Sequence, residues 1–191
     1  MAIILDIVNY MDNTVNQFEE MISMCRKTFE NKLNDYGATW RILRPESMTD
    51  QLLIKANRIR SLETKKESKI DEGVFPELIA IVNYGIMALI QIDRGFADSI
   101  DMDAAEALAL YDKFMTETKE LMYAKNHDYD EAWRMMRVSS YTDMILVKLH
   151  RIKQIEDNQG RVTVSEGVDG NYADIVNYAL FGMIKLHFGE E

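Results

Sequence analysis

The stretch that decides the fold is KLNDYGATWRILRPESMTDQLLIKANRIR, residues 32–60, because the chain contains it twice. The second copy, at 125–153, reads KNHDYDEAWRMMRVSSYTDMILVKLHRIK, and thirteen of 29 positions are identical at an offset of 93. Further on, DEGVFPELIAIVNY at 71–84 matches SEGVDGNYADIVNY at 165–178 at an offset of 94. Self-similarity at a fixed period indicates duplication of a whole folding unit. We therefore expect a first repeat at 1–94, a linker at 95–103 and a second repeat at 104–191, packed as one body.

Each repeat is expected to be helical, since two prolines and nine glycines in 191 residues leave little turn chemistry. Apolar residues recur at three- and four-residue steps, which predict helices at 18–33, 48–62, 76–92, 105–125, 141–156 and 170–187. Ser47, Ser140 and Asp169 are candidate caps at the starts of three of them. The last helix of each repeat is apolar nearly all round, as a central buried helix is. The predicted fold is all-α, with about eight helices and a pseudo-twofold axis.

Composition excludes several classes of function. The formal net charge of −10 argues against a general surface for long nucleic acid or an anionic membrane, because phosphate groups attract clustered Lys and Arg. A single nucleotide needs only a local basic group or a bridging cation. The one cysteine, Cys25, excludes an internal disulfide and fits a reducing compartment. The N-terminal run AIILDIV is too short to span a bilayer. We expect a soluble cytoplasmic protein, with a homo-oligomer as a possible assembly.

A pair of cations stands at the same place in both repeats: Lys55 with Arg58, and Lys148 with Arg151. Residues three apart on a helix share a face. Two cations presented together suit the oxygens of a phosphate chain. The same cations could instead lie on a solvated face or pair with Asp50 and Asp143. The residues alone leave both interpretations open.

Three carboxylates gather where the last helix of the second repeat begins: Glu166, Asp169 and Asp174. Oxygens converging there could hold Mg²⁺, which takes carboxylates, water and substrate phosphates as ligands. The first repeat keeps Glu72 but has Phe75 and Ala80 at the other two places, so we place the chemistry in the second repeat. Acids at a helix start also favour the helix dipole, which explains Asp174 poorly because it sits beside an apolar run. If Asp174 holds a metal, its replacement by alanine should be near neutral for stability.

Two amides lie within the apolar last helices, Asn83 and Asn177. An unsatisfied buried amide costs roughly 1–3 kcal/mol, so each must bond a neighbouring helix or a ligand. Asp128, Tyr129 and Trp133 repeat an acid and two aromatics already present at 35–40. These aromatics could clamp a nucleotide base or plug the core.

The motifs K-x-x-DYG-x-x-W, T-D-x-x-x-x-K-x-x-R-I and E-G-V…IVNY resemble the nucleotide modification associated domain family of the first, α-helical type, over about residues 18–188. Some members of that family are tandem duplications. The family is distantly similar to the all-α nucleoside triphosphate pyrophosphohydrolases of the MazG and dimeric dUTPase type, which hold Mg²⁺ with E-x-x-E and E-x-x-D carboxylates. The resemblance implies as metal ligands Glu117, Glu120, Glu166 and Asp169, with Asp174 alongside. The spacer between the two pairs is longer here than is usual in those enzymes.

The function expected from the sequence is Mg²⁺-dependent hydrolysis of a nucleoside triphosphate to the monophosphate and pyrophosphate. The residues assigned to it are Glu166, Asp169 and Asp174 for the metal, Lys148 and Arg151 for the phosphates, Tyr129 or Trp133 for the base, and Lys55, Arg58 and Glu72 across the pseudo-twofold. The alternative is a non-catalytic nucleotide-binding or scaffold protein of a nucleotide- or DNA-modification pathway. A third interpretation is a helical oligomerisation module.

Overall fold

The computed structural model describes residues 2–65, 73–129, 131–161 and 166–189, and the side chains of these residues except 2–12 and 127–129. The elements in chain order are α1 (Ala2–Tyr36), η1 (Thr39–Ile42), α2 (Pro45–Thr64), α3 (Val74–Arg94), α4 (Ala104–Tyr129), η2 (Ala132–Met135), α5 (Val138–Asp157) and α6 (Val168–Phe188), where η is a 3₁₀-helix. The described residues contain no strand. The all-α prediction is confirmed, and the order α1-η1-α2-α3 recurs as α4-η2-α5-α6.

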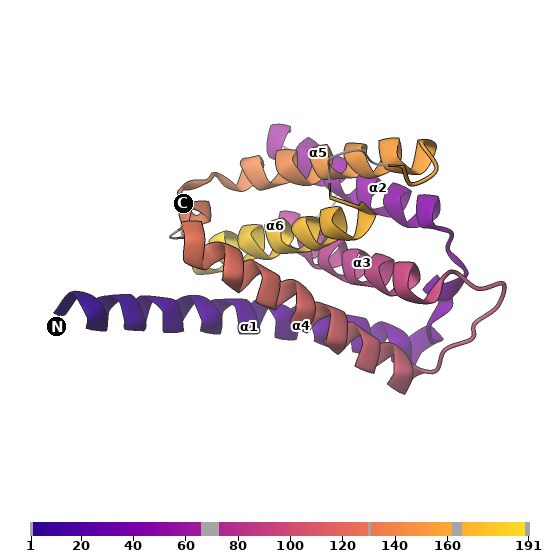
Figure 1. Ribbon diagram of the computed structural model, residues 1–191, viewed down its shortest axis with the longest axis horizontal. Coiled ribbons are helices and arrows are strands. Elements are labelled where there is room, and N and C mark those ends of the chain that lie inside the picture. Colours follow the sequence, from indigo (N-terminus) through magenta and orange to yellow (C-terminus); the bar gives the residue numbers. More distant parts are fainter. Residues whose placement is uncertain (1, 66–72, 130, 162–165, 190–191) are drawn as a thin grey trace.

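The helices pack in layers, each of which pairs a helix with its counterpart from the other repeat (Figure 1). α2 and α5 form one outer layer, α3 and α6 the middle layer, and α1 and α4 the other outer layer. This arrangement is what a pseudo-twofold axis between the repeats requires. The N-terminal end of α1 projects past the other helices (Figure 1).

The middle layer forms the centre of the core, because α3 and α6 carry apolar side chains on nearly every face. Small residues let these two helices approach closely. A Cβ at Gly85 would lie 2.5 Å from Val176 Cγ2, and one at Gly182 would lie 3.3 Å from Leu78 Cδ1. Among the described helices, α3 alone is long and apolar enough to cross a membrane, but 67% of that stretch is buried within the bundle. Such burial is expected of a core helix.

Hydrogen bonds between α2 and α5 explain one of the polar residues that both repeats retain. Thr49 Oγ1 donates to Glu156 Oε1 at 2.6 Å, and its counterpart Thr142 Oγ1 donates to Glu63 Oε1 at 2.7 Å. Burial raises the pKa of both carboxyl groups, and the threonine hydrogen bonds offset only part of that rise. The retained threonines therefore join one repeat to the other.

The aspartate that follows each threonine also contacts the opposite repeat. Lys153 Nζ lies 2.7 Å from Asp50 Oδ1, and Arg60 Nε lies 3.8 Å from Asp143 Oδ1. Both pairs are exposed, so each contributes little to stability. Their geometry nevertheless accounts for the repeated T-D motif as a contact between repeats.

α2 and α5 begin three residues before the starts predicted from the sequence. Their N-cap residues are Arg44 and Arg137, neither of which makes a side-chain capping bond. Pro45 occupies the first turn of α2, where its fixed φ favours helix initiation. Ser47 and Ser140 lie inside the first turn, so the prediction that they cap these helices is wrong.

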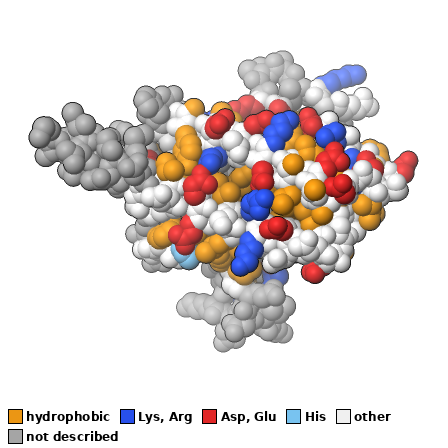
Figure 2. Space-filling view, turned by 90° about the horizontal axis from the view of Figure 1, so that it is seen from below, with side chains coloured by type: hydrophobic (Ala, Val, Ile, Leu, Met, Phe, Trp, Pro, Cys, Tyr) orange, Lys and Arg blue, Asp and Glu red, His pale blue; other side chains and the backbone are white. Residues whose placement is uncertain are grey.

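Charges of both signs are mixed over the α1–α4 side of the molecule. Arg26 Nε lies 2.7 Å from Asp112 Oδ1, and Lys119 Nζ lies 2.5 Å from Glu19 Oε1. On the face in Figure 2, basic side chains of the described residues lie beside acidic ones and form no continuous basic track. The positive charges on this face are thus largely compensated locally.

Candidate functional site

A cavity of about 240 Å³ lies in the first repeat, where the DYG-x-x-W motif ends α1. Its walls come from the end of α1, from η1 with the adjoining turn, and from the middle of α3. The aromatic and polar side chains that line it include Phe29, Lys32, Tyr36, Trp40, Asn83 and Tyr84. The repeated sequence motif of the first half therefore builds a hollow surrounded by aromatic rings.

A left-handed glycine turns the chain from α1 into η1. Gly37 has a φ of 66°, and its N–H donates to Leu33 O at 2.8 Å. Glycine adopts this conformation without the strain that a Cβ would introduce. The turn brings Tyr36 and Trp40, which flank it, onto the same cavity. In the second repeat, Glu131 takes up the left-handed conformation with a φ of 53°.

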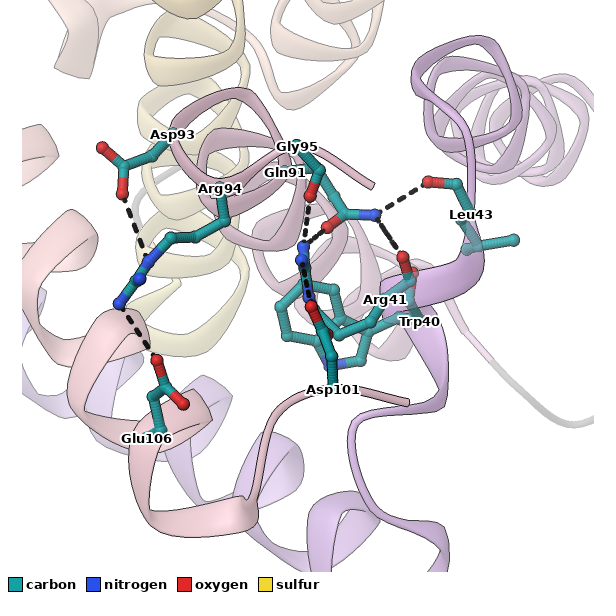
Figure 3. A network of polar contacts seen from close by, with 9 residues as sticks. All are labelled: Trp40, Arg41, Leu43, Gln91, Asp93, Arg94, Gly95, Asp101 and Glu106. Carbon is teal, nitrogen blue, oxygen red and sulfur yellow. Dashed lines mark hydrogen bonds and ion pairs between the residues drawn. The ribbon is translucent and has the colours of Figure 1, made fainter. Parts of the chain in front are cut away.

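A buried polar network anchors the η1 turn that carries Trp40 (Figure 3). Arg41 is only 2% exposed, and its guanidinium lies with Nε 2.9 Å from Asp101 Oδ1 and Nη1 2.6 Å from Gly95 O. Arg41 also donates to Gln91 Oε1. The hydrogen bond from Arg41 holds the pKa of the Asp101 carboxyl below its usual value. This network fixes the position of one cavity wall.

In each repeat, a side chain of the last helix donates hydrogen bonds to main-chain carbonyls at the 3₁₀ turn. Gln91 Nε2 donates to the carbonyls of Arg41 at 3.0 Å and Leu43 at 2.8 Å. Lys185, the counterpart of Gln91, donates to the carbonyls of Arg134 at 2.9 Å and Met136 at 2.6 Å. The segment that contains the retained Trp-Arg pair is thus hydrogen-bonded to the last helix in the same way in both repeats.

The two tryptophans of the motif differ in what covers them. The Trp133 ring stacks on Phe181, with centroids 4.5 Å apart and planes at 16°, and the Arg134 guanidinium carbon lies 4.2 Å from the Trp133 centroid. In the first repeat Met87 takes the place of Phe181, and the Phe29 ring near Trp40 is tilted at 6.4 Å. The cavity beside Trp40 is lined by Met87, whose counterpart Phe181 stacks on Trp133, and by Phe29, whose counterpart is Met122.

The indole N–H of Trp40 is a buried donor without a partner. Trp40 is 8% exposed, and its Nε1 makes no hydrogen bond with the described residues. The same is true of Trp133 Nε1. Buried polar groups are nearly always paired, so each such exception calls for an explanation. Because the unpaired indole N–H recurs at Trp133, it is a feature of the motif in both repeats and does not distinguish the cavity.

Lys32 and its counterpart Lys125 have different electrostatic surroundings. Lys125 Nζ lies 2.9 Å from Asp174 Oδ1. The first repeat has Ala80 at the place of Asp174, and Lys32 has no carboxylate partner among the described residues. Lys32 is exposed and lines the cavity. The cavity therefore has an uncompensated positive charge at its rim.

Three of the five predicted catalytic residues come together in the second repeat. Lys148 is 6% exposed, and its Nζ lies 2.5 Å from Asp174 Oδ2 and 3.6 Å from Glu166 Oε2. With Lys125 on the other oxygen, the Asp174 carboxylate meets two ammonium groups. Burial alone would raise the pKa of Asp174, but hydrogen bonds from the two lysines outweigh burial and lower it. Asp174 is held as a carboxylate by lysines.

Two further predicted catalytic residues stay at the surface. Arg151 and Asp169 are exposed and form no ion pair within the described part of the chain. α6 begins after Gly167, whose backbone is extended, so the prediction that Asp169 caps this helix is wrong. Asp169 instead lies in the first turn, where an acid favours the helix dipole.

The second predicted pair of metal ligands lies on α4. Glu117 and Glu120 are exposed, and Glu117 Oε1 lies 4.0 Å from Lys113 Nζ. Within the described ranges, no group of three acidic, histidine or cysteine side chains comes close enough to hold a metal ion. Glu72 and the side chains of Asp128 and Tyr129 lie outside the described residues.

The predicted phosphate-binding cations of the first repeat surround a buried acid. Glu77 is 3% exposed, with Arg58 Nη1 2.5 Å from its Oε1 and Lys55 Nζ 3.3 Å from its Oε2. Glu77 Oε2 has no partner of hydrogen-bond geometry, but the Lys55 ammonium is near enough to compensate its charge. Glu77 stands one helical turn before Ala80, the counterpart of Asp174. Each repeat thus neutralises a carboxylate on its last helix with a retained lysine.

The two retained amides bond neighbouring helices at equivalent places. Asn83 Nδ2 donates to Cys25 O at 3.1 Å, and Asn177 Nδ2 donates to Thr118 O at 3.3 Å, where 25 and 118 are counterparts. Tyr111 donates its hydroxyl proton to Asn83 Oδ1 at 2.7 Å. The counterpart of Tyr111 is a phenylalanine, and Asn177 Oδ1 has no partner among the described residues. Packing between helices is thus one role of these amides.

A family model described as nucleotide modification associated domain 1 matches the chain twice, at residues 32–92 and 125–186. The chain belongs to this family. Each copy of nucleotide modification associated domain 1 runs from the end of the first helix of its repeat through the 3₁₀ turn and the two following helices. The cavity lies within the first copy except for Phe29. No curated protein and no solved structure matches the chain. The family match does not itself show similarity to the all-α pyrophosphohydrolases.

Lys32 was not among the predicted site residues, and Trp40 was considered only as one of the aromatics that could clamp a base or plug the core. The prediction favoured the copy of nucleotide modification associated domain 1 with more acids. A signal for Lys32 was present in the alignment of the two copies. Beside the retained motif, the first copy has Met87 where the second has an aromatic ring, and Ala80 where the second has an acid. The missing acid marks the repeat whose motif lysine has no carboxylate partner among the described residues.

Proposed function

We propose that the first-repeat cavity binds the base and sugar of a nucleotide, which makes the chain a nucleotide-binding protein. The observation that carries this proposal is the cavity beside Trp40, which is walled by the aromatic rings of Phe29, Tyr36, Trp40 and Tyr84 and has Lys32 at its rim. Stacking of a base on an aromatic ring is worth about 1–3 kcal/mol. The description of the family, which refers to nucleotide modification, supports the same class of ligand.

The size of the cavity supports a base with its sugar as the enclosed part. Its volume of about 240 Å³ is below the roughly 300–1,000 Å³ of pockets that enclose drug-sized ligands. Phosphate groups of a bound nucleotide would therefore lie at the rim, on the side of Lys32. We also propose a cytoplasmic location, because Cys25 is a buried free thiol whose pKa is raised by burial and fits a reducing compartment.

The substitution Met87→Phe should lower nucleotide affinity by about tenfold or more, because it places in the first repeat the ring that covers Trp133 in the second. The fold should persist, because Met87 lines a cavity with room for the added ring. Isothermal titration with a panel of nucleosides and nucleotides measures the affinity, and a thermal melt checks the fold. The matched control is Phe181→Met, which alters only the second repeat. Unchanged affinity in folded Met87→Phe, or no binding of any panel member by wild type, contradicts the proposal.

A second candidate function is hydrolysis of a nucleoside triphosphate in the second repeat. The observation in its favour is the convergence of Glu166 and Asp174 on Lys148. If Lys148 bonded a phosphate, Glu166 would lose its ion-pair partner and Asp174 would keep only Lys125. The two carboxylates are a donor set that suits Mg²⁺ with waters and phosphates as further ligands. Bound Mg²⁺ would supply charge neutralisation and an activated water. Lys148 itself would hold a phosphate oxygen in place.

In an assay with Mg²⁺, this candidate predicts pyrophosphate release from at least one nucleoside triphosphate. Glu166→Gln should lower the rate by about tenfold or more while leaving the melting temperature unchanged, because the Glu166 side chain is 58% exposed. Asp157→Asn, an exposed acid on α5, is the control and should leave the rate unchanged. If no triphosphate of the panel yields pyrophosphate, or if Glu166→Gln is fully active, hydrolysis at this site is ruled out.

A further inference from the structure

We infer that the ligand of the first-repeat cavity is a nucleoside monophosphate, whose single phosphate is held by Lys32. This inference rests on the proposed nucleotide-binding function and narrows its ligand class. It follows from a count of the charges around the cavity, from a comparison with the second repeat, and from the aromatic rings in the cavity wall.

The positive charge available to a ligand at this cavity is small. Lys32 is the one cation among the described residues that line it. Arg41 follows Trp40 in the chain but forms an ion pair with Asp101. Lys55 and Arg58 form ion pairs with Glu77. A phosphomonoester carries a charge of about −1.5 to −2, which one ammonium group can largely compensate. A triphosphate carries more, and proteins meet that charge with several cations or with bound Mg²⁺. The chain as a whole has a net charge of −10, which adds repulsion.

In the second repeat, a carboxylate pairs with the lysine that corresponds to Lys32. Lys125, the counterpart of Lys32, lies 2.9 Å from a carboxylate oxygen of Asp174. In the first repeat Ala80 leaves that carboxylate out, while the lysine is kept. A phosphate oxygen bonded to Lys32 would supply the anion that Asp174 supplies in the second repeat. The retention of lysine without its acid is explained by an anion that arrives with the ligand.

The aromatic wall of the cavity fits the nucleoside part of the proposed ligand. Trp40 presents a ring that is not stacked as Trp133 is, and Phe29, Tyr36 and Tyr84 line the same cavity. A nucleobase has a flat π-face that stacks on aromatic rings of this kind. The aromatic wall and the lysine rim therefore fit the two ends of one molecule.

The test is isothermal titration of the full chain, without Mg²⁺, against the nucleoside, monophosphate and triphosphate of each common base. For the preferred base, the monophosphate should bind about tenfold more tightly than the nucleoside, and the triphosphate no more tightly than the monophosphate. Lys32→Ala should lower the affinity for the monophosphate to that for the nucleoside, and should leave the affinity for the nucleoside unchanged. Lys27→Ala, an exposed lysine on the same helix that does not line the cavity, should preserve the difference.

The outcomes separate this inference from the proposed function. If the triphosphate binds about tenfold more tightly than the monophosphate, or if Lys32→Ala keeps the preference for the monophosphate, the inference is overturned while nucleotide binding stands. If wild type binds neither nucleosides nor nucleotides, both are overturned. A thermal melt of Lys32→Ala confirms that any loss is not caused by unfolding, because this exposed side chain makes no ion pair among the described residues.

Discussion

Replacing Asp174 by alanine is expected to lower the free energy of unfolding by about 3 kcal/mol at neutral pH. Asp174 compensates Lys148, which is 6% exposed, at 2.5 Å and Lys125 at 2.9 Å. Without Asp174, the buried Lys148 ammonium has only the Glu166 carboxylate, 3.6 Å away. Removing one partner of a buried ion pair costs about 3–5 kcal/mol, and the remaining acid favours the lower end. This expectation replaces the near-neutral effect that a metal-binding Asp174 would show.

The loss should depend on pH in a defined direction. The pKa of Asp174 is lower in the folded state than its usual value, because two lysines hydrogen-bond the carboxylate. A lowered folded pKa contributes stability above the unfolded pKa, and that contribution is lost as the pH falls through the folded pKa. The difference between wild type and Asp174→Ala should therefore be full at pH 7 and should shrink below about pH 4.

Urea unfolding of both proteins over a pH series measures this effect. Asp157→Ala removes an exposed carboxylate and should change stability by no more than about 0.5 kcal/mol. An Asp174→Ala protein as stable as wild type at pH 7 would count against the structural ion pair. If Mg²⁺ also raised the melting temperature of wild type but not of the variant, Asp174 would be a metal ligand instead.

Arg41→Ala should destabilise the protein by about 4 kcal/mol, the larger of the two effects. Arg41 is among the largest fully buried side chains, and its loss leaves a cavity. It also leaves the buried Gln91 Oε1 without its donor. An unpaired buried acceptor costs about 1–3 kcal/mol, so the cavity and this lost bond together account for the estimate.

Denaturant unfolding of three variants at the η1 turn separates these contributions. Arg44→Ala, three residues on and exposed, should change stability by no more than about 0.5 kcal/mol. Arg41→Lys should fall between it and Arg41→Ala, because a lysine fills part of the space but lacks the planar fork that reaches both Asp101 oxygens. A loss below about 1 kcal/mol in Arg41→Ala would show that the network in Figure 3 does not hold the turn.

The helices could be predicted from the sequence because their pattern is local. The apolar surface of 76–92 and 170–187 indicates central helices, and α3 and α6 are the middle layer. Helix starts were less predictable, since Ser47 has the residue type of a cap but Pro45 sets the start of α2 earlier. The cap prediction weighed side-chain chemistry, whereas the fixed φ of proline decided the boundary.

The candidate site was harder to predict, because identical residues in the two repeats have different surroundings. Retention of Thr49 and Asp50 indicated importance, but contact between the repeats and contact with a ligand both preserve polar residues. Only the packing shows that these two hold α2 against α5. Likewise, Lys32 and Lys125 are equivalent lysines of the same motif. They differ because Lys125 pairs with Asp174, which lies about 50 residues further along the chain.

The covalent link between the repeats has a consequence for how their interiors can change. In a symmetric dimer of identical chains, every substitution occurs on both sides of the axis, so both hollows open or close together. Residues 95–103 join the two repeats in one polypeptide, and each position can therefore mutate independently of its counterpart. Met87 and Phe181 show the result, since Met87 lines the cavity of the first repeat, whereas the ring of Phe181 stacks on Trp133. Duplication in one chain thus lets equivalent positions of the two repeats differ in size and charge.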